Sequence, residues 1–404
     1  MRRNYFLIIG LILLIAVEIM KVYFIMPFPG SQQSNTISIA YFINNNIWWI
    51  RILLLITIFY PCLYYLVKGS AWQKILIVLC LGLYGFIFYM FNYKFLADKM
   101  FYQPKEKLFA NAAADTTNKN KLVIGVALNG EAKAYPIEII GYHHQVKDTV
   151  GNTPVMVTYC TVCRTGRVYS PLINGKPEVF RLVGMDHFNA MFEDATTKSW
   201  WRQENGEAIT GALKGKKLEE IPSTQMRLAD WIALHPNTMI LQSDKNFLAK
   251  YDSLKGFDEG TLKSSLEARD TGSWKMKSWV VGVQVNNHAK AYDWNELVKN
   301  KKIQDSITGM PLLLTIDSTG KTFYVFNRRV DGQTLHFSTI EHNGSTVYGG
   351  YAIDLIDAET HSLWNPNGSC FDGALKGKQL AAVQAYQEFW HSWESFHPGT
   401  EKYK

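Results

Sequence analysis

The chain has 404 residues, of which 47% are hydrophobic, and its formal net charge is +7. This length is too great for one small core, so we expect two or three folding units. The excess positive charge comes from scattered lysines without a basic run or a basic helix, which argues against nucleic-acid binding.

Residues 1–100 are predicted to form a membrane region, because their apolar runs are long enough to span a bilayer as helices. We place three spans at residues 5–28, 47–67 and 75–95. Glu18 and Lys21 lie near one end of the first span, where a lysine can reach the membrane interface. No small-residue cleavage site follows this run, so a removable signal peptide is not favoured. The expected partner is therefore the lipid bilayer.

The positive charges predict an orientation for these spans. Arg2 and Arg3 precede the first span, and the loop at residues 27–46 has no lysine or arginine, whereas the next loop carries Lys68 and Lys74. Because positively charged loops stay on the cytoplasmic side, the N-terminus is expected inside. We therefore predict a multi-pass protein of the bacterial inner membrane with its soluble domain on the extracytoplasmic side.

After a polar linker at residues 101–120, the sequence repeats itself. The first copy covers residues 121–242, a charged connecting segment covers 243–278, and a degenerate second copy covers 279–404. Several identical pairs share one constant shift: Val123 with Val280, Tyr135 with Tyr292, and Asp148 with Asp305. After a small insertion in the second copy, the matches are Asp194 with Asp357, Trp201 with Trp364, and residues 211–216 with 373–378. These matches predict an internal duplication.

Each copy is predicted to be α+β and rich in strands. Alternating runs at residues 121–128 and 155–159 are typical of strands, and Asn129-Gly130 is typical of a two-residue hairpin turn. Each copy is expected to close with a Trp-bearing helix, near residues 226–234 and 385–396, that stops at a His-Pro pair. The fold class is thus a three-helix membrane segment followed by a duplicated, strand-rich α+β domain.

Residues present in one copy only are the candidates for function, since shared residues are expected to serve the fold. The first copy alone carries His143, His144, Cys160, Cys163 and Arg164. Their counterparts by the constant shift are Asn300, Lys301, Asp317, Gly320 and Lys321. The remaining cysteines stand apart from this cluster, so the five thiols do not form a disulfide scaffold. If the chain has a site, we expect it in the first copy.

Three interpretations of the Cys-x-x-Cys pair stay open. Cys160 and Cys163 lie between two strand-like runs, at residues 155–159 and 167–170, which is the setting of a metal knuckle. With His143 or His144 as a further ligand, the site would suit zinc, or copper if a methionine joined it. The second interpretation is a thiol redox pair in which Arg164 stabilises a thiolate. The third is an inert pair or a local disulfide in a non-enzymatic module.

Other candidates are weaker. Met185, Asp186 and His187 could supply metal ligands, and the Trp200-Trp201 pair is interpreted as core packing in preference to a ligand pocket. His235 and His397 occur in both copies and are interpreted as helix-end residues. No motif assigns a reaction, a catalytic residue or a protein partner, so the sequence leaves open whether the chain is an enzyme.

A specific combination of motifs occurs at residues 134–136, His143, 146–151, 154–163, 194–201 and 206–209. In these motifs the soluble part resembles the bacterial domain-of-unknown-function family thirty-one seventy-nine (DUF3179). The resemblance extends from residue 121 to the C-terminus and implies membership without an assigned activity. The chain departs from the family pattern at three places: Thr161-Val162 replace Pro-Leu, Arg164 replaces Gly or Asn, and His143-His144 replace His-Glu.

Overall fold

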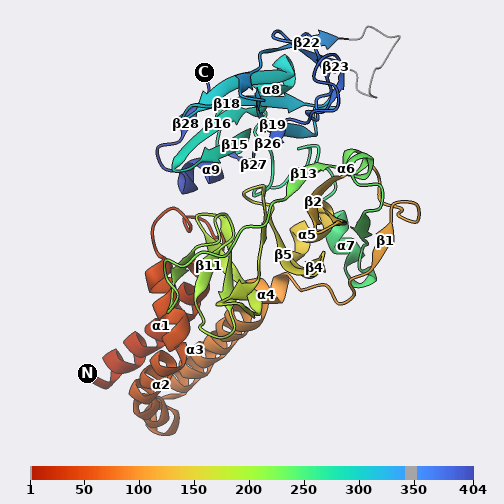
Figure 1. The fold of residues 1–404 in the computed structure, drawn as a ribbon. Coiled ribbons are helices and arrows are strands. Elements are labelled where there is room, and N and C mark those ends of the chain that lie inside the picture. The colour runs from red at the N-terminus through yellow and green to blue at the C-terminus, as the bar shows by residue number, and fades with distance from the viewer. Residues whose placement is uncertain (1, 342–352) are drawn as a thin grey trace. The chain divides into compact units, whose positions relative to one another are not determined.

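The computed structural model describes residues 2–341 and 353–404. The chain divides into two compact units (Figure 1). Unit one comprises Met1–Tyr102 and Ile173–Leu218, and unit two comprises Gln103–Leu172 and Glu219–Lys404. The α+β fold class is confirmed, because three apolar helices precede a strand-rich part.

Unit one begins with three long helices. These are α1 (Arg2–Tyr23), α2 (Ile37–Lys68) and α3 (Ala71–Tyr89), the last of which continues as a π-helical turn at Met90–Lys94. Ser70 starts α3 through a capping box, in which its hydroxyl accepts from Gln73 N and its own N–H donates to Gln73 Oε1. The predicted bounds at 5–28 and 47–67 are wrong: α1 ends at Tyr23, and α2 starts at Ile37. α2 starts early because its helix includes the polar residues 44–46, which the apolar-run argument excluded, whereas α1 gives way to a turn at residues 24–27.

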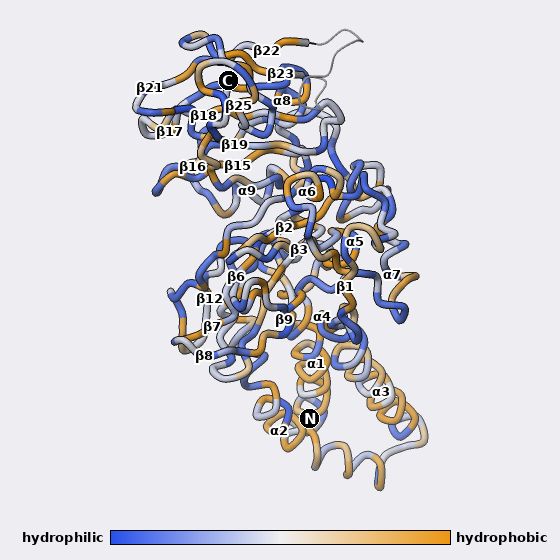
Figure 2. Tube along the Cα trace, turned by 45° about the vertical axis from the view of Figure 1, so that its right-hand side comes forward, coloured by the Kyte–Doolittle hydropathy of each residue, from blue (hydrophilic) through white to orange (hydrophobic). Residues whose placement is uncertain are grey.

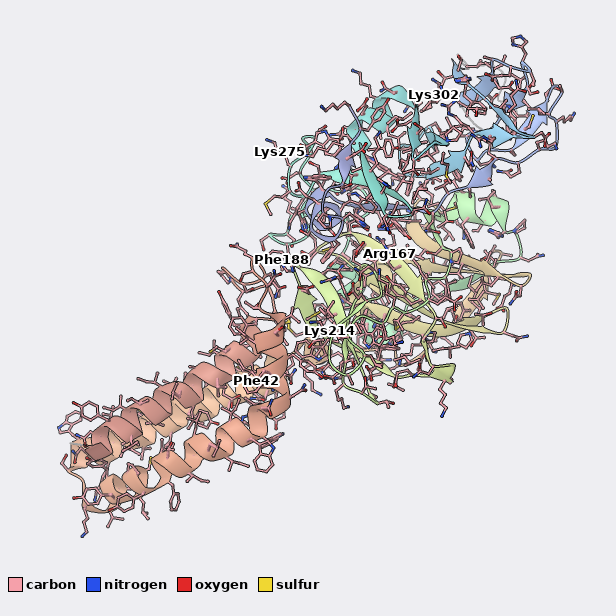
Figure 3. All side chains as sticks on the ribbon, turned by 60° about the vertical axis from the view of Figure 1, so that its left-hand side comes forward. Phe42, Arg167, Phe188, Lys214, Lys275 and Lys302 are labelled. Carbon is pink, nitrogen blue, oxygen red and sulfur yellow. The ribbon has the colours of Figure 1, made fainter. Side chains whose placement is uncertain are left out.

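All three helices are long and apolar enough to cross a membrane. Their surfaces expose large apolar side chains such as Ile12, Trp49 and Leu79, at 60%, 68% and 64% exposure. Figure 2 shows the same bias as a predominance of hydrophobic colour along α1–α3, and Figure 3 shows their side chains projecting along the whole bundle. A soluble bundle would bury these groups, so the surface suits lipid.

Charged side chains lie inside this apolar bundle. Arg51 donates two hydrogen bonds to the Glu18 carboxylate, at 2.6 and 2.7 Å, and both residues are buried. Asn92 bridges the group: its Nδ2 donates to Glu18 at 2.9 Å, and its Oδ1 accepts from Arg51 at 2.8 Å and from Lys21 Nζ at 2.7 Å. The three helices are therefore joined by one polar network.

The rest of unit one is a four-stranded antiparallel sheet. It consists of β9 (Phe180–Asp186), β10 (Asn189–Asp194), β11 (Trp200–Arg202) and β12 (Ala208–Thr210). The short α4 (Ala97–Met100) also belongs to this unit. Gly184 on β9 has φ +157° and approaches the segment after α1 so closely that a Cβ would lie 2.3 Å from Ile25 O. Met185 N donates to the same carbonyl at 2.7 Å, which ties the sheet to the helical region.

The predicted first copy, together with one strand of the preceding linker, contributes two sheets to unit two. One has the order β1 (Phe109–Asn111), β14 (Met239–Leu241), β3 (Glu131–Pro136), β2 (Leu122–Leu128) and β13 (Thr224–Arg227). The other consists of β4 (Gln145–Val150), β5 (Thr153–Cys160) and β6 (Thr165–Tyr169). Helices α5 (Ile137–His143) and α6 (Leu228–Leu234) belong to the same copy, and β7 (Leu172–Ile173) pairs with β8 (Lys176–Pro177).

The second copy contributes three sheets of four strands each. The first has the order β27 (Ala385–Phe389), β15 (Trp279–Val285), β16 (His288–Asp293) and β28 (Glu401–Lys402). The second consists of β17 (Lys302–Ile307), β18 (Met310–Ile316), β19 (Phe323–Asn327) and β26 (Ala381–Ala382). The third consists of β22 (Phe337–Glu341), β23 (Ile353–Asp357), β24 (Leu363–Trp364) and β25 (Cys370–Asp372).

Short elements complete unit two. Helices α8 (Trp294–Asn300) and α9 (Trp390–Phe396) belong to the second copy, together with the hairpin of β20 (Arg329–Val330) and β21 (Gln333–Thr334). The connecting segment is largely irregular and contains α7 (Leu248–Asp252) after a 3-10 turn at Lys245–Phe247.

Corresponding residues of the two predicted copies make equivalent contacts in the structure. A Cβ on Gly125 or on Gly282 would lie 2.3 or 2.2 Å from the indole of Trp231 or Trp393. The buried tyrosines also correspond: Tyr135 donates to Asp148 at 2.7 Å, and Tyr292 donates to Asp305 at 3.0 Å. The shared glycines and tyrosines therefore serve packing and internal hydrogen bonding.

A buried carboxylate with four donors also occurs twice. Asp357 accepts from Thr360 N, Thr360 Oγ1, Ser362 N and Trp364 Nε1, at 2.5, 2.8, 3.1 and 2.9 Å. Asp194 binds the corresponding groups of Thr197, Ser199 and Trp201 in unit one. Trp200 and Trp201 are almost fully buried, in agreement with the packing role expected for this pair.

The Trp-bearing helices are shorter than predicted. Residues 385–389 form strand β27, which pairs antiparallel with β15, and α9 begins only at Trp390. In the first copy Met226 likewise lies in β13, and α6 begins at Leu228. The helical expectation for these residues was wrong because pairing with a neighbouring strand overrides local propensity. His235 and His397 do cap the helices; the His397 ring stacks on Trp393, and the His235 ring lies tilted against Trp231.

Candidate functional site

The Cys-x-x-Cys pair lies in the turn between two strands. Cys160 is the last residue of β5 and pairs with Thr165, the first residue of β6. Residues 161–164 form the turn, which Arg164 closes with φ +57° and an N–H that donates to Thr161 O at 3.3 Å. This is the strand-to-strand position that the sequence predicted, and it differs from a helix N-terminus.

Both cysteines are buried, and neither is part of a disulfide. Cys160 and Ser392 of α9 lie close enough to Cys163 to influence the pKa of its thiol. Burial raises the pKa of Cys163 well above its usual value, and the neighbouring Cys160 and Glu388 raise it further. The Cys163 thiol is therefore protonated at physiological pH, which is the opposite of an activated thiolate.

Arg164 extends from this turn into the rest of unit two and is 1% exposed. Its guanidinium donates to Gln387 Oε1 at 3.0 Å and to Phe257 O at 3.1 Å, and it lies 3.9 Å from the ring centre of Trp279. Gln387 belongs to β27, Phe257 to the connecting segment, and Trp279 to β15. Arg164 thus links the thiol turn to the second copy and does not serve the thiolate that the redox interpretation assigned to it.

A buried ion pair involves the third residue of β6, three positions after the turn. Arg167, labelled in Figure 3, pairs with Glu388 of β27, and both are at most 1% exposed. Glu388 also accepts from Ser392 Oγ at 3.1 Å, and the Arg167 guanidinium lies 3.4 Å from the ring centre of Tyr386. Ser392 therefore binds the carboxylate that pairs with Arg167 and also influences the pKa of the Cys163 thiol.

The histidines of the first copy have partners of their own. His143 Nε2 lies 2.7 Å from the hydroxyl of Tyr251 on α7, and His144 Nδ1 lies 3.1 Å from Tyr142 O. Burial lowers the pKa of His144 to about 4, so its ring is neutral at pH 7. Within residues 2–341 and 353–404, no three His, Cys, Asp or Glu side chains gather as a metal-binding group.

The further candidates from the sequence lie in unit one. Asp186 accepts from Arg202 at 2.6 Å, and one of its oxygens lies 2.6 Å from His187 Nδ1. The hydrogen bonds and the positive charges of these two residues hold the pKa of Asp186 below its usual value, although burial acts in the opposite direction and is the largest single influence. This arrangement is an internal ion-pair group, and Met185 contacts Ile25 O through its backbone.

Several residues around the thiol turn were not found from the sequence. They are Tyr159, Arg167, Gln387, Glu388 and Ser392. The Tyr159 hydroxyl and Gln387 Nε2 are buried without a hydrogen-bond partner in the part of the chain that the structure describes. The buried Arg164 and Arg167 both require acceptors, but their burial is visible only in the structure. Their partners lie more than two hundred residues away, which no local pattern reveals.

The sequence model of one protein family, described as a protein of unknown function (DUF3179), matches residues 104–400. The chain belongs to this family. The match spans both copies, so the DUF3179 region contains the thiol turn together with its contacts in the second copy. No curated protein and no solved structure matches the chain.

Proposed function

We propose that this DUF3179 protein is anchored in the bacterial inner membrane by three spans, with its family domain on the extracytoplasmic side, and that Cys160 and Cys163 form a dithiol–disulfide couple. The observation that carries the proposal is the placement of both buried cysteines in one tight turn between β5 and β6. An oxidising compartment outside the cytoplasm is where such a couple can cycle. The charge pattern of the loops supports this side of the membrane.

The reaction is a thiol–disulfide exchange with an external disulfide. The two thiols lose two electrons and two protons as one S–S bond forms, and the partner's disulfide is reduced to two thiols. Burial penalises a thiolate but penalises neither the neutral dithiol nor the neutral disulfide. The site therefore stabilises both end states, and exchange is slow until the turn opens.

The second copy supports the turn without repeating its chemistry. Phe389 N donates to Cys163 O at 2.9 Å, and Arg164 reaches Gln387 on the same strand. We infer that the two copies arose by internal duplication and that the thiols were kept or gained in one of them. The second copy has a carboxylate at the equivalent turn in place of the thiols. There Asp317 accepts hydrogen bonds from Lys321 N and Thr322 N.

Differential alkylation of the purified full chain tests the redox proposal. Treatment with oxidised and then reduced glutathione should form and break one disulfide between Cys160 and Cys163, read as a change in mass after alkylation in denaturant. Cys160→Ser should abolish the change. Cys370→Ser is the matched control, because Cys370 is also a buried thiol but lies on β25. A pair that stays reduced at every glutathione ratio would leave only a structural role.

Metal binding through Cys160, Cys163 and His143 or His144 remains a second proposal, with zinc or copper as the metal. It requires a histidine to leave its partner, Tyr251 or Tyr142, and to join the two thiolates. Elemental analysis after incubation with either metal tests it. Stoichiometric metal that is lost in Cys160→Ser supports the site, and a folded, metal-free protein ends the proposal.

A further inference from the structure

The thiol turn is covered by the corner of the second copy at which β27 ends and α9 begins. Phe389, the last residue of β27, donates its N–H to Cys163 O at 2.9 Å. His391, in the first turn of α9, has its Nε2 3.2 Å from Val162 O. Val162 and Cys163 are 3% and 0% exposed. Both carbonyl groups in the middle of the turn are therefore held by the second copy.

His391 is the donor in its contact with the turn. A carbonyl oxygen only accepts, so the proton of the ring is on Nε2. Burial lowers the pKa of His391 to about 4, which keeps the ring neutral at pH 7. The ring also stacks on Phe389, with 6.1 Å between ring centres and 25° between ring planes. Packing therefore fixes the position from which the imidazole reaches Val162.

The corner has anchors that do not involve the turn. Trp390 N donates to Ser278 O at 2.9 Å, and His391 N donates to Met276 O at 2.9 Å. Trp390 is also buried, with its ring edge-on to Trp274 at 5.1 Å. The start of α9 is thus fixed to the end of the connecting segment. Opening of the thiol turn therefore requires residues 162 and 163 to leave the corner, whereas the corner itself can stay folded.

The corresponding corner of the first copy contacts the turn of the second copy. Arg227 pairs with Asp317 at 3.3 Å, and Asp230 accepts a hydrogen bond from Thr322 Oγ1. Asp317 and Thr322 belong to the turn that corresponds to the thiol turn. The contact between corner and turn is therefore reciprocal, and its two versions can be compared.

The two corners differ in the residues that contact the turns. The shift that matches the tryptophans of α6 and α9 aligns His391 with Ala229 and Ser392 with Asp230. The imidazole donor is therefore present only at the corner that covers the thiols. Like the two cysteines, His391 is specific to one side of the duplicated fold, which makes it a candidate for function and not only for packing.

We propose that His391 is a positioning residue that holds the turn of Cys160 and Cys163 closed, and that release of its bond to Val162 O admits the disulfide partner to the thiols. Both cysteines are 0% exposed, so a partner disulfide cannot reach either sulfur in the closed turn. The second copy thereby controls the rate of exchange. This inference rests on the proposed thiol chemistry and names the element that regulates it.

Alkylation of the folded full chain in detergent tests the inference, with N-ethylmaleimide as the reagent and peptide mass mapping to follow each cysteine. His391→Ala leaves a buried carbonyl unsatisfied in the closed turn, so Cys160 and Cys163 should be labelled at least about fivefold faster. His391→Phe keeps a ring beside Phe389 and should have the same effect. His391→Gln, whose amide donates, should restore slow labelling.

Two controls separate opening of the turn from general loss of stability. Cys370, a buried thiol on β25, should keep its labelling rate in every variant. Ser395→Ala removes a hydrogen bond to His391 O within α9, at 2.6 Å, and should leave the labelling of the turn unchanged. Unchanged labelling in both His391→Ala and His391→Phe, or equal acceleration at Cys370, would overturn the positioning role.

The rate of disulfide formation with oxidised glutathione distinguishes this inference from the redox proposal. It should rise in His391→Ala by the same factor as the alkylation rate. Faster alkylation without a disulfide at any glutathione ratio would refute the redox couple and leave His391 as the residue that closes the turn. A disulfide that forms in His391→Ala at the rate of the unsubstituted chain would overturn the role of His391 alone.

Discussion

The pairing of Glu18 with Arg51 makes a quantitative prediction about the helical bundle. Glu18→Gln keeps the shape of the side chain but removes its charge, and it leaves the guanidinium of Arg51 buried at 4% exposure. Two charge-assisted bonds, at 2.6 and 2.7 Å, become neutral or are lost. Asn92 cannot replace the carboxylate, because its Oδ1 already accepts from Arg51 and Lys21.

The expected loss is large because an unpaired buried charge is costly. Removing one partner of a buried ion pair costs about 3–5 kcal/mol, and a lone arginine at the centre of a membrane span costs about 3 kcal/mol on insertion scales. We therefore expect Glu18→Gln to lower the free energy of unfolding by about 3 kcal/mol. The double variant with Arg51→Gln should recover part of this loss, since two amides can hydrogen-bond without a net charge.

A double-mutant cycle measures this coupling. The free energy of unfolding is determined for the full chain in mixed micelles by titration with a denaturing detergent. Asn46→Ala is the control on α2, because the Asn46 amide donates to Phe42 O of the same helix, and little change is expected. If Glu18→Gln costs less than about 1 kcal/mol and the two substitutions are additive, the pairing does not hold the helices together.

Three further predictions concern the soluble part. The pKa of His144 is about 4 in the folded chain against 6.5 in a model peptide, so the unfolded chain binds a proton first as the pH falls. Stability should therefore decrease between pH 6.5 and 4, by up to about 3 kcal/mol, and His144→Gln should flatten this part of the pH profile of the melting temperature. Asp357→Asn places an NH2 group among four donors and should cost about 3 kcal/mol in denaturant unfolding; a loss below about 1 kcal/mol would contradict the hydrogen-bond geometry. The raised pKa of Cys163 predicts that iodoacetamide labels this thiol far more slowly at pH 8 in the folded chain than in denaturant, and that stability falls as the pH rises above 9, less so in Cys163→Ser. Equal labelling rates in the two states would refute the buried, protonated thiol.

Parts of this architecture were accessible from the sequence because they depend on local patterns. The length of an apolar run predicts a membrane helix, and the two-residue period around Cys160 and Cys163 predicts strands on either side of a turn. Asn129-Gly130 predicted a hairpin turn, and both residues have positive φ. The thiols could be singled out because the two copies can be compared with each other, and only the first copy has cysteines at these positions.

The tertiary structure alone decided which groups meet. Glu388 binds Arg167, and Gln387 binds Arg164, although each pair is separated by more than two hundred residues of sequence. Residues 385–389 were expected to be helical, but they form β27 because they pair with β15. His143 was an obvious metal ligand by residue type, yet the fold places its Nε2 on Tyr251. Local periodicity determines which residues are buried, whereas the partner of a buried charge or hydrogen-bonding group is determined by long-range packing, which a single sequence does not encode in any local pattern.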